Sequence, residues 1–180
     1  MMAAIPETTI ANTYWLALGR FLSYYANVEW QVNRLVRRYY RLGIDIGNII
    51  LGPLRYDSAI EHLNRLRAAD RISEADAKEI DEIKAQLGPI TKFRNDLVHY
   101  GSSHSVPEGF VVSNEDWAYM DSKIRRYIVS DQILDDATFD LWKIFFKLQI
   151  LIRPESSRTY GDLHHELLHA TWRYKPPSLK

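Results

Sequence analysis

The feature that most constrains the fold is a long helical pattern over residues 73–100, interrupted near its end by a charged residue. Its apolar residues are spaced by three and four positions, as on the buried face of an amphipathic helix: Ile80, Ile83, Leu87, Ile90, Leu97 and Val98. Continuing this stripe from Ile90 leads to Arg94, where a charge needs compensation if it is desolvated. Pro89 predicts a kink just before that position, because proline removes a backbone donor and clashes with the preceding turn.

Three polar residues accompany the interruption: Arg94, Asn95 and His99. Asn95 and His99 are one helical turn apart and therefore share a side of the helix. Arg94 and His99 are separated by roughly 140° around the axis and by less than two turns along it. A guanidinium, an amide and an imidazole can thus border one cleft, where they could hold a phosphodiester and transfer protons. We expect Asp96 to cap or pair locally, outside this chemistry.

Composition sets wider limits. A chain of 180 residues, 46% apolar and 26% charged, fits one soluble domain, here residues 1–180. It has no cysteine, which excludes disulfides and thiolate chemistry. No apolar run reaches the length of a membrane span, and residues 1–12 lack a secretory pattern, so we expect a cytoplasmic protein with no membrane partner. The net charge of zero means that nucleic-acid binding would need local patches.

The remaining pattern is mostly helical. Helices are predicted for residues 14–42, 57–70, 131–153 and 159–172, with a connecting loop at 44–56. Two short strands, 109–112 and 124–129, predict a β-hairpin. Ser73 followed by Asp76 is typical of a capped helix start. The fold class is therefore mainly all-α: an up-and-down helical bundle over about residues 14–152, with a small β-hairpin insertion and an extra C-terminal helix within 155–180.

Two further groups of residues in the first predicted helix have alternative interpretations. Arg37, Arg38 and Arg41 lie in its last turns, where they can contact phosphate or simply offset the helix macrodipole. Glu29 lies at the edge of the apolar stripe, where an unpaired carboxylate would be unfavourable. It can extend to solvent or pair with a buried cation such as Arg94. A buried Arg94–Glu29 pair, with His99 hydrogen-bonded at a subunit interface, is the purely structural alternative for the motif.

A second motif, His165-Glu166-Leu167-Leu168-His169, matches the HExxH pattern of zinc proteases. Two imidazoles at i and i+4 can bind one metal ion, and the glutamate can activate a water molecule. Residues 170–180 contain no His, Asp or Glu to supply a third ligand, and few predicted strands could hold an extended peptide. Zinc catalysis by His165, Glu166 and His169 is therefore a remote alternative, and we expect neither a metal nor another cofactor.

The segment Arg94-Asn95-Asp96-Leu97-Val98-His99, late in a long helix and followed by Tyr100-Gly101, resembles the motif of the HEPN superfamily. That family is marked by an arginine, an adjacent polar residue and a histidine separated from the arginine by four to six residues, and here four residues separate Arg94 from His99. The similarity extends in outline over residues 14–152, although only the motif is specific. The hairpin insertion and the extra C-terminal helix depart from a simple four-helix member.

The resemblance implies a homodimer in which two motif helices face each other across a composite cleft. Many family members are metal-independent endoribonucleases, some are toxins with an antitoxin or nucleotidyltransferase partner, and others act in defence or RNA processing. Arg94, Asn95 and His99 would then be catalytic, and Arg37, Arg38 and Arg41 would contact RNA. Some members only bind or scaffold, so a catalytically inactive HEPN-like module is the alternative.

Overall fold

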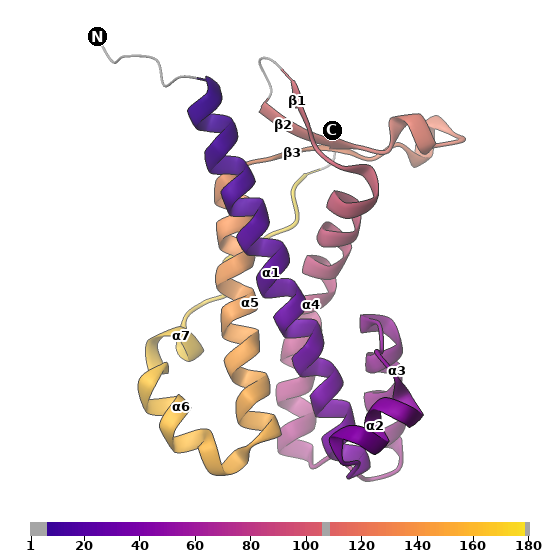
Figure 1. Cartoon of the computed structure of the whole chain (residues 1–180), viewed down its shortest axis with the longest axis vertical. Helices are drawn as coiled ribbons and strands as arrows, with labels where there is room; N and C mark the ends of the chain where they lie inside the picture. Colours follow the sequence, from indigo (N-terminus) through magenta and orange to yellow (C-terminus); the bar gives the residue numbers. More distant parts are fainter. Residues whose placement is uncertain (1–6, 106–108, 179–180) are drawn as a thin grey trace. The chain divides into compact units, whose positions relative to one another are not determined.

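The computed structural model (Figure 1) describes residues 7–105 and 109–178, and the chain divides into two compact units. The first unit comprises residues 1–23, 89–139 and 173–180, and the second comprises residues 24–88 and 140–172. Three long helices contribute to both units: α1 (Glu7–Tyr40), α4 (Glu74–Tyr100) and α5 (Asp131–Ile152). Most described residues are helical, which confirms the predicted mainly-α class. No helix in the described ranges is long and apolar enough to cross a membrane.

A small antiparallel sheet follows α4 in the first unit. Its strands are β1 (Ser103–Ser105), β2 (Gly109–Ser113) and β3 (Arg126–Val129), in the order β1-β2-β3. The predicted hairpin is confirmed as β2 and β3, with Val111 opposite Ile128 and Val112 opposite Tyr127. Two 3-10 turns, Glu115–Trp117 and Asp121–Lys123, lie in the connection. Strand β1 was not predicted, because three polar residues give no alternating apolar signal.

Aromatic side chains form much of the core of the first unit. Tyr14 of α1 stacks on Phe110 of β2, with 3.6 Å between the ring centroids. Phe93 of α4 contacts Phe21, Tyr127 and Tyr174, with centroid distances between 5.4 and 6.2 Å. Phe110 is 6% exposed, and each of the other five rings is at most 4% exposed. The sheet and the end of α4 are therefore fixed to one shared apolar core.

The buried stripe of α4 contains Phe93, where the sequence pattern had placed Arg94. The buried apolar residues of its last turns are Ile90, Phe93 and Leu97, so the stripe passes beside Arg94. Arg94 is half-buried at the edge of the stripe. Val98, which the sequence pattern placed in the stripe, is 50% exposed. The bulky Phe93 ring occupies the inward position, because an arginine there would have to be fully desolvated.

The second unit contains two shorter helices, α2 (Ile44–Leu51) and α3 (Tyr56–Ala68). The predicted loop over residues 44–56 is therefore wrong for its first eight residues. Gly47, taken as a sign of a loop, lies where α2 meets Arg37 of α1. A Cβ on Gly47 would be 2.9 Å from Cδ of Arg37, and Arg37 Nη2 donates to the carbonyl of Gly52 at 3.3 Å. This glycine permits close approach rather than a turn.

Helix starts and stops in the second unit follow the sequence more closely. Ser73 Oγ accepts a hydrogen bond from the amide of Asp76 at 3.1 Å, which confirms the predicted cap of α4. Helix α3 begins one residue before the predicted Asp57. Helix α4 continues through Pro89 to Tyr100, and the kink expected there stays a prediction.

The C-terminal segment departs from its prediction. One helix was expected over residues 159–172, but the structure has a 3-10 turn (Pro154–Ser156), α6 (Ser157–Leu163) and α7 (His165–His169). Residues 170–178 have no regular structure. Lys143 of α5 donates a hydrogen bond to the carbonyl of Ala170 and lies 4.1 Å from the ring centre of Trp172. These contacts replace the helical hydrogen bonds that the pattern predicted.

Candidate functional site

The predicted motif lies in the last two turns of α4, within the first unit. Arg94 and Asn95 are half-buried, whereas His99 is exposed. Arg94 Nη1 donates a hydrogen bond to Asn95 Oδ1 at 3.1 Å. The amide thus contacts the guanidinium directly, and the imidazole is accessible from solvent. One helix therefore presents a hydrogen-bonded cation and, five residues later, an accessible proton-transfer group.

Asp96, between these residues, has a structural partner across the core. Its side chain is buried and accepts a hydrogen bond from the phenol of Tyr127 at 3.2 Å. Arg125 Nη1 lies 3.6 Å from the same carboxylate. Burial and then the charge of Asp96 raise the pKa of Tyr127, so its hydroxyl remains a donor through neutral pH. Asp96 was expected to cap or pair locally, but its partners Tyr127 and Arg125 are distant in the sequence, and the hydrogen bond attaches the motif turn to β3.

The exposed side of the same turns adds a further feature. Val98, half-exposed, and His99 are neighbours on the surface of α4, and Lys92 is exposed two turns earlier. A single chain therefore provides a surface with a cation, an imidazole and an apolar side chain. A cleft of the kind that holds a phosphodiester would need a second surface opposite this one.

The predicted phosphate-binding arginines lie in the second unit, and they differ from one another. Arg37 is partly used to hold α2, through its contacts with Gly47 and Gly52. Arg38 lies over the ring of Tyr39, with 5.6 Å to the ring centre. Arg41 is exposed just beyond the end of α1, with a left-handed φ of 57°. Arg41 is thus the most available of the three to an anion, because Arg37 and Arg38 are both half-buried.

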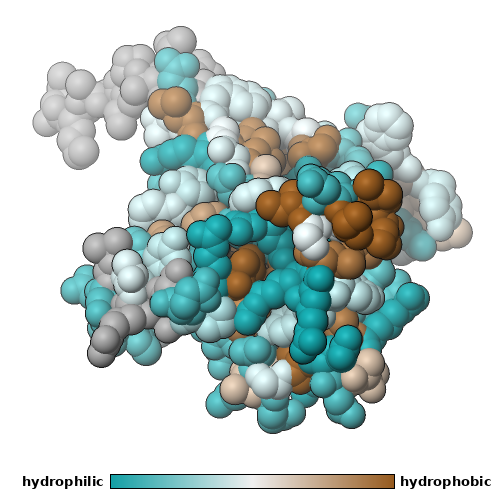
Figure 2. All heavy atoms as spheres, turned by 60° about the horizontal axis from the view of Figure 1, so that its bottom comes forward, coloured by the Kyte–Doolittle hydropathy of each residue, from teal (hydrophilic) through white to brown (hydrophobic). Residues whose placement is uncertain are grey.

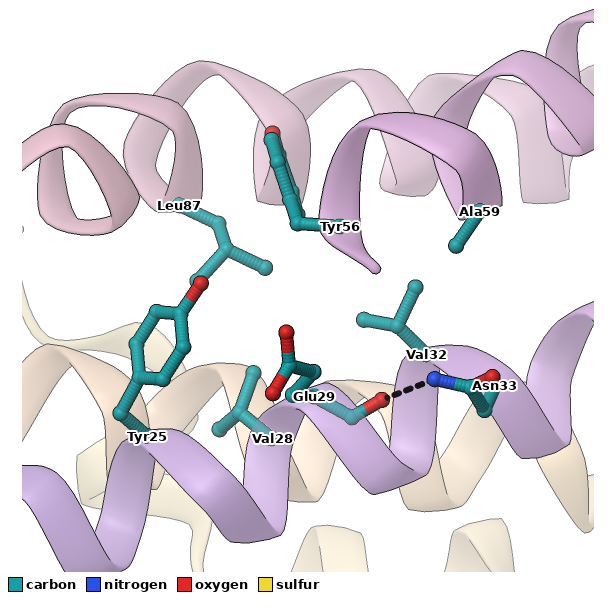
Figure 3. Close-up of a pocket in the computed structure, with 8 residues that line it drawn as sticks. All are labelled: Tyr25, Val28, Glu29, Val32, Asn33, Tyr56, Ala59 and Leu87. Carbon is teal, nitrogen blue, oxygen red and sulfur yellow. Dashed lines mark hydrogen bonds between the residues drawn. The ribbon is translucent and has the colours of Figure 1, made fainter. Parts of the chain in front are cut away.

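Glu29 lies in the second unit on α1 and is half-buried. Figure 3 shows its carboxylate directed between the side chains of Tyr25, Tyr56 and Leu87. The space among these side chains does not admit a water molecule. Among the described residues of its own unit, Glu29 makes no ion pair, and it lies in a different unit from Arg94. Its predicted pairing with Arg94 therefore stays a prediction.

Asn33, one turn beyond Glu29, is a structural residue that the sequence did not indicate. Its amide donates to the carbonyl of Glu29 at 2.9 Å (Figure 3) and to that of Leu54 at 2.9 Å. Its oxygen accepts from the amide of Leu54 at 2.8 Å. Leu54 lies two residues before the start of α3, so Asn33 attaches this connection to α1. An asparagine within an apolar stripe was the signal that could have identified it.

The HExxH match lies on α7, a helix of five residues. His165 and His169 are adjacent, with 4.3 Å between their ring centroids, and both are exposed together with Glu166. His164, beside them, stacks on Phe146 at 3.7 Å. Within the described ranges, no three His, Asp or Glu side chains are placed to hold one metal ion. The two imidazoles therefore form at most a two-ligand site.

No family model, curated protein or solved structure matched this chain. The function is therefore inferred from the positions and contacts of the individual residues. The last turns of α4 combine a cation, an amide and an imidazole, contributed by Arg94, Asn95 and His99.

Proposed function

We propose that this protein is a metal-independent endoribonuclease of the HEPN type, with a composite site that contains Arg94, Asn95 and His99. The observation that carries the proposal is the hydrogen bond between half-buried Arg94 and Asn95, beside the exposed His99. The sequence pattern of the HEPN motif is complete in these residues. The Asp96–Tyr127 hydrogen bond supports it further, because it holds the same turn against the sheet.

The chemistry follows from the groups present. In RNA, the ribose 2′-oxygen attacks the adjacent phosphorus, and the bond from phosphorus to the 5′-oxygen breaks. His99 can take the proton of the 2′-hydroxyl as a general base. Arg94 can bind the non-bridging oxygens as negative charge develops on them. Because Asn95 Oδ1 already accepts from Arg94, its amide nitrogen can donate to the same phosphate.

A homodimer would complete this reaction. One imidazole must accept a proton while another donates one to the leaving 5′-oxygen, and each chain contributes one His99 in its motif. A two-fold axis beside α4 would place two imidazoles in one cleft and cover the half-exposed Val98. Arg38 and Arg41, with the remaining donors of Arg37, would contact the RNA backbone. An antitoxin or nucleotidyltransferase partner belongs to the same proposal.

The test uses the purified protein with mixed RNA in the presence of EDTA, beside DNA of matched sequence. We expect the RNA to be cut, leaving 2′,3′-cyclic phosphate ends, and the DNA to remain intact because it lacks the attacking hydroxyl. Cleavage of both polymers, or cleavage that requires a divalent metal, would contradict the proposed mechanism. RNA binding without cleavage would instead favour the catalytically inactive binding module.

A further inference from the structure

The second unit exposes an unusually apolar helix. Four isoleucines of α2 are between 51% and 80% exposed: Ile44, Ile46, Ile49 and Ile50. We call these four residues the α2 face. Figure 2 shows hydrophobic residues gathered in one patch on this side, beside a band of hydrophilic residues. The α2 face exposes on the order of 500 Å², at the upper end of what single patches on monomers expose, which marks it as an interaction surface.

The charges around the α2 face indicate what kind of surface can bind there. Residues 34–51 contain four arginines and one acidic residue, Asp45. Arg37 lies against α2 through Gly47, and Arg41 is three residues before the helix begins. Packing two α2 faces against each other would bring their arginines together, which like-charge repulsion disfavours. The occupant should therefore be apolar at its centre and acidic at its edge.

A segment of the first unit has these properties. The connection between β2 and β3 exposes Trp117 by 76%, Tyr119 by 75% and Met120 by 54%. Glu115 and Asp116 precede them, are exposed, and form no ion pair with another described residue. We call residues 115–120 the hairpin tip. Lys123 lies over one face of the Tyr119 ring, 5.4 Å from its centre. Residues 113–123 are nevertheless acidic overall, with three acidic residues and one basic residue.

We propose that the hairpin tip of one copy of this protein docks on the α2 face of a second copy. The two surfaces expose apolar areas of similar size, together on the order of 1,000 Å², which is the range of weak, specific interfaces. Tryptophan and tyrosine are the side chains that most often anchor such contacts, and here they meet aliphatic side chains. Glu115 and Asp116 would face the arginines beside α2. The contact is heterologous and does not depend on the proposed ribonuclease activity.

The test measures molecular mass against concentration by sedimentation equilibrium with the full-length chain. One variant, Ile46→Glu with Ile49→Glu, changes the α2 face, and another, Trp117→Ala with Tyr119→Ala, changes the hairpin tip. Each variant should weaken the association through this contact by about tenfold or more. Both variants retain any dimer formed through α4, so the comparison concerns association beyond that dimer. Circular dichroism checks that both variants are folded. The control is Trp15→Ala with Leu16→Ala, which removes apolar side chains that are also at least half exposed.

The decisive sample is an equimolar mixture of the two variants. One variant retains the hairpin tip and the other retains the α2 face, so the mixture should associate through this contact, which neither variant forms alone. Added salt should weaken this association, because opposite charges flank the contact. A mixture that stays dissociated, or variants that associate as wild type does, would overturn the proposal. Binding of the wild type but not of the α2 variant to vesicles of phosphatidylglycerol, with no self-association, would assign the α2 face to a membrane surface instead.

Discussion

Tyr127 on β3 donates a hydrogen bond to buried Asp96 on α4, with 3.2 Å between the phenol oxygen and the carboxylate. Asp96 lies between Asn95 and His99 in the sequence, so this bond fixes the turn of α4 that carries the proposed chemistry. The hairpin, which a simple helical bundle does not require, thereby supports the candidate site directly. Precise placement of a catalytic group depends on such supporting contacts.

Replacing Tyr127 with Phe should destabilise the protein by about 1–2 kcal/mol, because the buried carboxylate of Asp96 loses a donor while Arg125 stays close. Urea denaturation of wild type and variant measures this difference. The control is Tyr100→Phe, since the hydroxyl of this half-buried tyrosine makes no hydrogen bond among the described residues. Equal losses for both variants would mean that the Asp96 hydrogen bond contributes nothing specific.

Alkaline pH should destabilise the second unit through Tyr56. Burial, and then the neighbouring Tyr25 and Asp57, raises the pKa of Tyr56 from 10.0 to about 12. A raised pKa means that the folded state holds its proton more tightly than the unfolded state does. The associated stability is fully present below pH 10 and is lost as the pH rises from 10 to about 12. Urea titrations across this range should show a shallower decline for Tyr56→Phe, and identical slopes would contradict the assignment.

Two glycines should respond in opposite directions to the same substitution. Gly19 lies inside α1, and an added Cβ would meet nothing within 4 Å, so Gly19→Ala should stabilise the protein by about 0.5–1 kcal/mol. Gly101 follows α4 with φ of +70°, and Gly101→Ala should destabilise it by about 1 kcal/mol. Thermal unfolding of both variants provides the comparison. Stabilisation by Gly101→Ala would show that the helix end does not need the left-handed conformation.

Chelation should leave both the fold and the RNA cleavage unchanged. His165 and His169 form only a two-ligand pair among the described residues, and such a site is too weak to contribute to folding. The midpoint of thermal unfolding should therefore be the same with EDTA as without it. A large drop in that midpoint, together with stoichiometric zinc in protein purified without added metal, would favour the HExxH interpretation.

Periodicity predicted the long helices well, because α1, α4 and α5 each bury an extended apolar stripe. It was less successful where a tertiary contact decided the structure. Gly47 is helical because it fits against Arg37, and the residues after Ala170 are irregular because Lys143 binds that carbonyl. Both contacts join residues at least ten positions apart, which a local pattern cannot represent.

The sequence pattern drew attention to Arg94 and His99 as polar residues late in an otherwise apolar helical pattern, and their catalytic role stays a prediction. Their surroundings could not be predicted in the same way. The pattern placed Arg94 in the stripe and gave no reason to prefer Phe93, because positions three and four residues after Ile90 both fit a helical stripe. Tyr127 as the partner of Asp96 depends on the register of β3 against the core, which the sequence does not specify.

The most direct test of the central claim compares RNA cleavage in EDTA by wild type, His99→Ala and His169→Ala. Both substitutions remove an exposed histidine, so their effects on folding should be similarly small. We expect His99→Ala to slow cleavage by about a hundredfold or more, because it removes the proton-transfer group, and His169→Ala to cleave at the wild-type rate. Equal cleavage by all three proteins, or loss of cleavage only in His169→Ala, would contradict a catalytic site at Arg94, Asn95 and His99.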